Sequence, residues 1–235
     1  MPTALRLIAG LGNPGPQYAK TRHNAGADWV RELARQFHIS MTLDSKFKAE
    51  IGRGIVLNHD VRLLIPVTYM NNSGDAIGAA AHFFKWSAEE ILIAHDEVAF
   101  EPGTVKLKNG GGENGHNGLK SVRARLGNQD GYNRLRIGVG HPGNKNQVNY
   151  YLTQQTPAEA ERASIAAAGQ LSDGILRDML AGNWQSAMTA LHAPVQKGAT
   201  TPSANHGDQQ HKSGEHDGIC LLYTSDAADE GLGVD

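Results

Sequence analysis

Short apolar segments alternate with helix-like segments along the first 193 residues, and this alternation restricts the possible folds more than any other feature. Strands that alternate with helices favour an α/β protein, in which helices cover both faces of a central, mostly parallel sheet and so form three layers. The expected strands are residues 5–9, 61–67, 90–94, 104–108 and 135–139, and the expected helices are residues 25–37, 75–84, 118–126, 156–172 and 175–191.

Local signals mark where two of these helices begin. Asn24 stands directly before residues 25–37, where a side-chain N-cap is expected. Thr156 and Glu159 have the spacing of a capping box, and Pro157 would occupy the first helical position.

Charge is distributed unevenly along the chain. The 235 residues include 22 Lys and Arg and 24 Asp and Glu, and the resulting net charge of -2 argues mildly against a nucleic-acid partner. Residues 194–235 contain seven of the acidic residues and only two of the basic ones, however. The first 193 residues therefore carry 20 basic and 17 acidic side chains, a net charge of +3.

The composition also changes after residue 193. Residues 194–218 are polar, rich in Gly, Ser and His, and without hydrophobic periodicity, which predicts disorder. The closing CLLYTSDAADE resembles adapter sequence that has been read through in a translated assembly. We therefore expect one domain over residues 1–193 and a disordered acidic tail over 194–235, and we interpret about the last 16 residues as an artefact.

Several classes of protein are excluded at this stage. The single cysteine, Cys220, rules out an intramolecular disulfide framework and any multi-cysteine metal site. The longest apolar runs are too short to span a bilayer, and the first residues lack the layout of a secretory signal. We expect a soluble cytoplasmic protein that has no membrane partner.

Residues 10–15, GLGNPG, match the dinucleotide-binding fingerprint, but their context does not. Pro14 and Pro16 prevent a helix from beginning where the pyrophosphate would need its N-terminus. The acidic residue expected about 20 positions later is Glu32, which falls inside a predicted helix. We interpret the segment as a tight turn that presents the side chain of Asn13.

His23 and Asp96 are the candidates for acid–base chemistry. His23 lies between the glycine turn and the first helix, and a neutral imidazole can take a proton from water near pH 7. Asp96 follows a predicted strand, where it could either orient a histidine or cap the next turn. No G-x-S-x-G motif is present, which favours activated water over a covalent intermediate. The histidines lack zinc-ligand spacing, so we predict no metal.

Two further segments follow predicted strands. In residues 69–74, Asn71 offers an amide that can donate and accept hydrogen bonds, while Asn72 or Ser73 could simply cap a helix. In residues 106–120, a run of glycines ends at a helix start, which is a natural anion site. Basic residues are concentrated from here to residue 145, so contact with a nucleic-acid backbone is expected: Lys106, Lys108, Lys120, Arg123, Arg125, Arg134, Arg136 and Lys145.

Five motifs together resemble the bacterial peptidyl-tRNA hydrolases over about residues 4–192. They are GLGNPGPQYAKTRHNAG, PVTYMNNSG, ILIAHDEV, GGGxxGHNGLKS and RLRIGVGHPG, in this order and spacing. The resemblance implies a monomeric, single-domain α/β enzyme with a mixed sheet and no metal or other cofactor. It also implies hydrolysis of the ester between a peptide and the 3′ ribose of tRNA, which recycles tRNA from peptidyl-tRNA dropped by ribosomes.

The resemblance also assigns roles to individual residues. His23 resembles the general base, Asp96 its orienting partner, and Asn13 the residue that helps to distinguish blocked from free aminoacyl groups. Contacts to the 3′ end or the peptide are expected from Tyr18, Tyr69, Asn71 and Asn117, an apolar wall from Met70, and tRNA binding from Lys106, Lys108 and Arg136.

Some alternatives stay open. The oxyanion donor could be Asn71, Asn13 or a nearby backbone N–H group. Glu113 departs from the family pattern and places a negative charge near the expected tRNA path. The same basic face would also suit a catalytically silent RNA-binding module, and a metal-dependent hydrolase is a third hypothesis.

Overall fold

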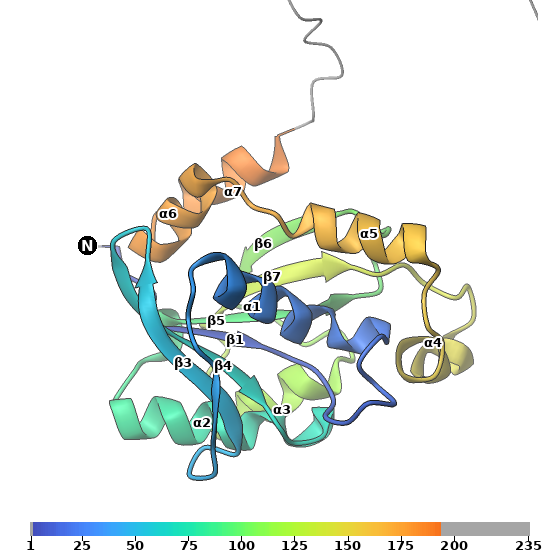
Figure 1. The fold of residues 1–235 in the computed structure, drawn as a ribbon, viewed down its shortest axis with the longest axis horizontal. Helices are drawn as coiled ribbons and strands as arrows, with labels where there is room; N and C mark the ends of the chain where they lie inside the picture. The colour runs from blue at the N-terminus through green and yellow to red at the C-terminus, as the bar shows by residue number, and fades with distance from the viewer. Residues whose placement is uncertain (1, 194–235) are drawn as a thin grey trace, which may run out of the picture. The chain divides into compact units, whose positions relative to one another are not determined.

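The computed structural model describes residues 2–193, which form one seven-stranded sheet with helices on both faces (Figure 1). The expectations for residues 194–235 lie outside the described residues. The strand order is β2-β3-β4-β1-β5-β7-β6. The strands are β1 (Leu7–Gly10), β2 (Thr42–Asp44), β3 (Ala49–Val56), β4 (His59–Pro66), β5 (Ile91–Glu97), β6 (Val105–Asn109) and β7 (Asn133–Gly138).

The sheet is parallel at its centre and antiparallel at its edges. Strands β4, β1, β5 and β7 run parallel, so their C-terminal ends meet at one edge of the sheet. The outer pairs β2–β3, β3–β4 and β6–β7 are antiparallel. The predicted α/β fold with a mixed sheet is confirmed, although antiparallel pairs are as numerous as parallel ones. Sites in such sheets form where the carboxyl ends of the parallel strands meet.

The helices lie in two layers around the sheet (Figure 1). Side chains alternate between the two faces along each central strand: Ile8 and Leu92 pack in the core under α1, whereas Leu7 and Ile93 pack in the core under α2 and α3. No helix among residues 2–193 is both long and apolar enough to cross a bilayer. The α-helices are α1 (Ala25–Gln36), α2 (Ser73–Phe84), α3 (Asn117–Arg125), α4 (Val148–Thr153), α5 (Glu159–Ala168), α6 (Asp173–Ala181) and α7 (Trp184–His192), and the 3-10 helices include η1 (Arg22–Asn24) and η2 (Met70–Asn72).

The hairpin of β3 and β4 was only half predicted, because residues 49–56 gave no clear strand signal. Its two-residue turn has positive φ at both Leu57 (47°) and Asn58 (71°), as the twist of a tight hairpin requires. Glycines weaken the strand propensity of β3. A Cβ atom at Gly54 would lie 2.5 Å from Cγ1 of Ile39, so this strand needs glycine where the segment after α1 crosses it.

Two of the predicted helices end or begin elsewhere than expected. The helix expected over 175–191 is divided into α6 and α7 at Gly182, which has a φ of 81° that ends a helix. The helix expected over 156–172 spans only Glu159–Ala168, because the backbone at Ala158 is extended with a ψ of 154° and no side chain caps the helix. Helix α4 was not predicted.

Candidate active site

Two histidines meet one aspartate at the C-terminal edge of the parallel strands. Asp96 ends β5, His23 lies in η1 before α1, and His116 directly precedes α3. Nδ1 of His23 lies 2.9 and 3.0 Å from the two carboxylate oxygens of Asp96. Nε2 of His116 lies 2.9 Å from Oδ1. The Asp96 side chain is only 1% exposed, and those of His23 and His116 are 10% and 8% exposed.

The hydrogen bonds around this cluster assign the protons. Nδ1 of His116 accepts from the backbone N–H groups of Gly118 and Leu119 at 3.1 and 3.4 Å, so the ring proton of His116 is on Nε2 and is donated to Asp96. The carboxylate also accepts from Nδ1–H of His23. Nε2 of His23 therefore keeps a free lone pair, which is what a general base needs.

Electrostatics favour a charged aspartate beside a basic histidine. Burial on its own would lower the pKa of His23, but the charge of Asp96 and its hydrogen bond outweigh burial and hold the pKa above the ordinary 6.5. Burial would raise the pKa of Asp96, but the two histidines hold it far below its usual range. Burial lowers the pKa of His95 to about 3, so this neighbour stays neutral. Asp96 is thus ionised near neutral pH, beside a His23 whose pKa is higher than that of a free imidazole.

The raised pKa of His23 predicts how activity depends on pH. The base works only when its imidazole is neutral, so kcat/KM should rise as the pH increases through the pKa of the free enzyme. Because this pKa lies above 6.5, the midpoint of the acid limb is expected above pH 6.5. Initial rates between pH 5 and 9 measure it, and a midpoint near 5 would contradict the assignment.

Asn13 is held in place by its own backbone and by its side chain. The Asn24 side chain accepts from the backbone N–H of Asn13 at 2.8 Å and donates to its carbonyl oxygen at 3.0 Å. Oδ1 of Asn13 accepts from the backbone N–H of Met70 at 2.8 Å. The predicted N-cap role of Asn24 is therefore wrong, since its side chain makes no cap bond and clamps the glycine turn instead. The orientation of the Asn13 amide is fixed, with its NH₂ group not engaged by the described residues.

The segment after β4 contributes the next residues. Met70 is buried and packs against the start of α3, where a Cβ atom at Gly118 would lie 2.5 Å from its sulfur. Tyr69 is exposed and meets Tyr18 edge to face at 6.4 Å between ring centroids. Asn71 is exposed, as is Asn117 at the first position of α3. Neither Asn72 nor Ser73 accepts a cap bond, and the Ser73 hydroxyl donates to the Met70 carbonyl instead.

Four of the eight predicted basic residues lie on the antiparallel pair β6–β7, whereas the other four lie on α3 and in the 3-10 helix Lys145–Gln147. Lys106 is paired with Arg136 across the strands, and Lys108 with Arg134. Like charges in such positions repel one another unless other groups compensate them. Lys106 and Lys108 are exposed, whereas Arg136 donates twice to Oε2 of Glu97 at 2.9 and 3.0 Å. The two lysines therefore carry the charge that is free to meet a phosphate.

The structure gives three residues near the site roles that the sequence analysis did not assign to them. His116 was considered only with the other histidines as a possible metal ligand, because the helix was expected to begin at residue 118 and histidine is not a preferred N-cap residue. Arg134 is buried and donates to the carbonyl groups of Gly110 and Gly112, and so fixes the glycine run. Glu113 is paired with Arg123 at 3.0 Å, which compensates the negative charge that departed from the family pattern.

His23, Asp96 and His116 also offer three potential metal ligands within 4.8 Å of one another. In the observed arrangement both ring N–H groups are donated to the carboxylate, so hydrogen bonds account for the clustering. A metal would have to displace both protons, which links its binding to pH. The alternative that Asp96 caps the following turn is not seen, since Oε1 of Glu97 accepts from the N–H of Ala99 there.

Within residues 2–193, an α/β sheet thus carries a buried His–Asp–His centre at its carboxyl edge, an arrangement that suits an enzyme of acid–base chemistry. The family model described as peptidyl-tRNA hydrolase matches residues 7–199. Peptidyl-tRNA hydrolases of Pseudomonas putida and Pseudomonas aeruginosa are 48% and 47% identical over 191 residues, covering 81% of this chain and 98% of theirs. The chain belongs to the peptidyl-tRNA hydrolase family.

A solved structure agrees with the sequence relatives. The crystal structure of peptidyl-tRNA hydrolase from Acinetobacter baumannii superposes with a TM-score of 0.78 at 40% identity, covering 82% of this chain and 97% of that one. The resemblance stated from the motifs and the expected α/β fold are thus confirmed.

Proposed function

We propose that this chain hydrolyses the ester bond between the peptide and the 3′ ribose of peptidyl-tRNA, with water activated by His23. The observation that carries the proposal is the free Nε2 of a buried His23 whose Nδ1–H is held by Asp96. Family membership supports the choice of substrate. The proposal describes a monomeric cytoplasmic enzyme that needs no metal.

The first chemical step follows from the geometry. Nε2 of His23 takes a proton from water as the oxygen attacks the ester carbonyl, and Asp96 stabilises the imidazolium that forms. The negative charge that develops on the carbonyl oxygen needs a preorganised donor. The amide of Asn13 is already oriented, whereas Asn71 is exposed, which favours Asn13 or nearby backbone N–H groups as the donor.

The remaining residues are proposed to bind the substrate. Contacts to the 3′ end or the peptide would come from Tyr18, Tyr69, Asn71 and Asn117, and Met70 would form an apolar wall of the site. The substrate's blocked amino group is an uncharged amide. Asp96, the carboxylate at the centre, is buried and occupied by the two histidines, so no carboxylate there is free to attract an ammonium group.

The test is release of peptide from purified peptidyl-tRNA by the full chain, in the presence of EDTA. Turnover is expected to persist in EDTA. Binding of tRNA without cleavage would favour a silent RNA-binding module, and loss of turnover that zinc restores would favour a metal-dependent hydrolase.

The exposed lysines predict the salt dependence of tRNA binding. Lys106→Ala and Lys108→Ala should each weaken binding and reduce the slope of log affinity against log salt by roughly 1, because each removes one phosphate contact. Arg136→Ala should change the slope less, since Glu97 already compensates this charge.

Filter-binding titrations at several salt concentrations measure these slopes. Arg6→Ala is the matched control: its side chain is 53% exposed and precedes β1, at the opposite edge of the sheet from Asp96. An unchanged slope in both lysine variants would remove them from the tRNA face.

A further inference from the structure

Arg22, the residue directly before His23, is buried and carries an unusual set of contacts. Its side chain is 7% exposed. Nε and one terminal nitrogen donate to the two oxygens of Glu161, each at 2.8 Å, in a bidentate pair. The other terminal nitrogen lies 3.4 and 3.3 Å from the carbonyl oxygens of Tyr151 and Gln155, and the guanidinium covers the Tyr151 ring at 3.9 Å. One side chain thus joins η1 to both α4 and α5.

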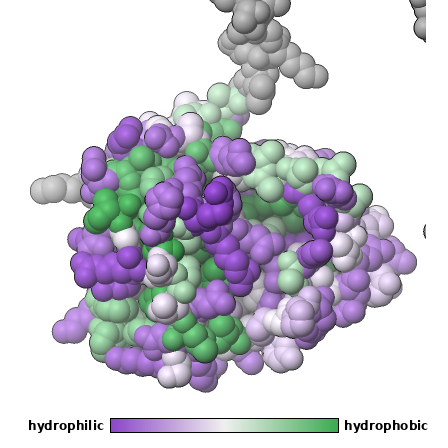
Figure 2. Space-filling view, in the orientation of Figure 1, coloured by the Kyte–Doolittle hydropathy of each residue, from purple (hydrophilic) through white to green (hydrophobic). Residues whose placement is uncertain are grey.

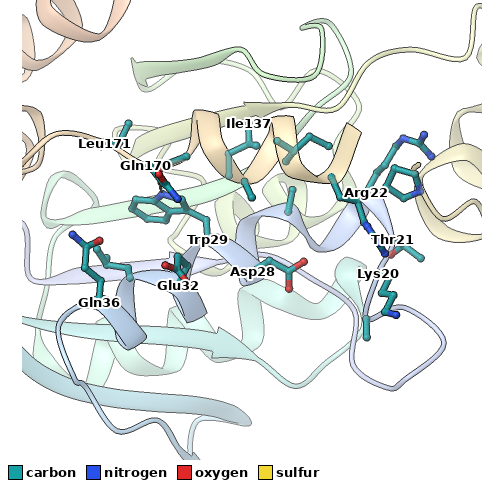
Figure 3. Close-up of a pocket in the computed structure, with 18 of the residues that line it drawn as sticks. Lys20, Thr21, Arg22, Asp28, Trp29, Glu32, Gln36, Ile137, Gln170 and Leu171 are labelled. Atoms are coloured by element: carbon teal, nitrogen blue, oxygen red, sulfur yellow. Dashed lines mark hydrogen bonds between the residues drawn. The ribbon is translucent and has the colours of Figure 1, made fainter. Parts of the chain in front are cut away.

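The contacts of α5 explain why this junction matters. No residue of α5 is fully buried. A cavity of about 300 Å³ separates α5 from α1, and Trp29, Ile137 and Ile165 are among its apolar lining residues. Figure 2 shows the hydrophobic floor of this hollow between the two helices, and Figure 3 shows Arg22 at one end of it. Polar contacts therefore supplement the limited packing of α5, in which Ile165 and Ala168 lie partly buried against the core.

Two anchors hold α5 over α1. One is the pair of Arg22 and Glu161. The other is the indole N–H of Trp29, which donates to the carbonyl of Gly169 at 2.8 Å, beyond the end of α5. The first anchor is fixed to the same three-residue helix, η1, that carries His23.

We propose that Arg22 is a positioning residue for His23 and that Glu161 sets the rate of hydrolysis through it. Asp96 holds the His23 ring from the sheet, while Arg22 holds the backbone of η1 from the side of α4 and α5. The proposal rests on the proposed role of His23 as general base. Both side-chain oxygens of Glu161 accept from Arg22, and no hydrogen bond joins Glu161 to the His–Asp–His centre, so Arg22 is the structural link between Glu161 and His23.

The experiment compares kcat, KM and melting temperature for wild type, Glu161→Gln, Arg22→Ala, Arg22→Lys and the double variant Arg22→Ala/Glu161→Gln. Glu161→Gln should lower kcat about ten-fold with KM within two-fold, because a displaced base slows chemistry without removing a substrate contact. Arg22→Ala should lower kcat at least ten-fold as well. The kcat of Arg22→Lys should lie between those of Arg22→Ala and wild type. The double variant should be no slower than Arg22→Ala, since one junction is broken in both.

The matched control is the bidentate pair of Arg53 and Asp60 on the β3–β4 hairpin, with distances of 2.9 and 2.6 Å. Asp60→Asn should leave kcat unchanged. The proposal is overturned if Glu161→Gln lowers only the melting temperature, if it raises KM while kcat stays the same, or if the two substitutions have additive effects. If Arg22→Ala does not fold, the kcat and KM of Glu161→Gln and Arg22→Lys still test the proposal. His23→Ala is measured in the same assay to test the proposed function separately. The proposed role of His23 fails if that variant stays active, whatever the results for Arg22 and Glu161.

Discussion

Replacing His23 by alanine is expected to slow hydrolysis of peptidyl-tRNA by about 10³-fold while tRNA binding is retained. General base catalysis contributes typically 10²- to 10⁴-fold. Neither neighbouring histidine can replace His23, because Nδ1 of His116 accepts from backbone N–H groups and the unpartnered Nε2 of His95 is fully buried. Binding is retained because the exposed lysines on β6 are untouched. Single-turnover release of peptide and filter binding of tRNA measure the two properties separately.

The control for this variant is His82→Ala. His82 is exposed on α2, so its loss should leave both rate and binding unchanged. Turnover of His23→Ala near the wild-type rate would remove His23 as the base. A variant that loses tRNA binding together with activity would instead indicate a folding defect.

The sequence predicted the parts of the fold that depend on local patterns. The central strands and α1 to α3 were placed within a few residues, because buried apolar runs and helical spacing determine them. β3 was missed because Gly52 and Gly54 give it a weak strand propensity, and those glycines are needed only because the segment around Ile39 crosses the strand. The division at Gly182 was missed because an apolar pattern runs through it.

The sequence motifs predicted which residues belong to the site, but not all of the contacts among them. His23 and Asp96 lie 73 positions apart in sequence and 2.9 Å apart in space, and it was the family resemblance that paired them. His116 gave no comparable signal, because only the packing of α3 against η2 brings it to the carboxylate. For Asn24 the sequence signal was present but misleading. Its position before α1 predicted an N-cap, whereas its side chain bonds to the backbone of Asn13.

The second large effect is expected for Asp96→Asn, which should lower kcat by about 10³-fold. The carboxylate accepts from both histidines, whereas an amide has one oxygen and one NH₂ group. If the NH₂ group faces His23, the ring proton moves to Nε2 and the lone pair no longer faces water. Loss of the orienting aspartate in a comparable hydrolytic triad costs about 10⁴-fold for this reason.

The same substitution also tests the electrostatics of the centre. The charge of Asp96 and its hydrogen bond raise the pKa of His23 against the effect of burial, so removing that charge should move the acid limb of the residual activity to lower pH. Rates of Asp96→Asn and wild type between pH 5 and 9 measure the shift, with Asp60→Asn, at a partly exposed position far from the centre in sequence, as the control. An acid limb that stays in place would mean that the ionisation seen in the rate belongs to another group. A rate within ten-fold of wild type would mean that His116 or the protein backbone can orient His23 without the carboxylate.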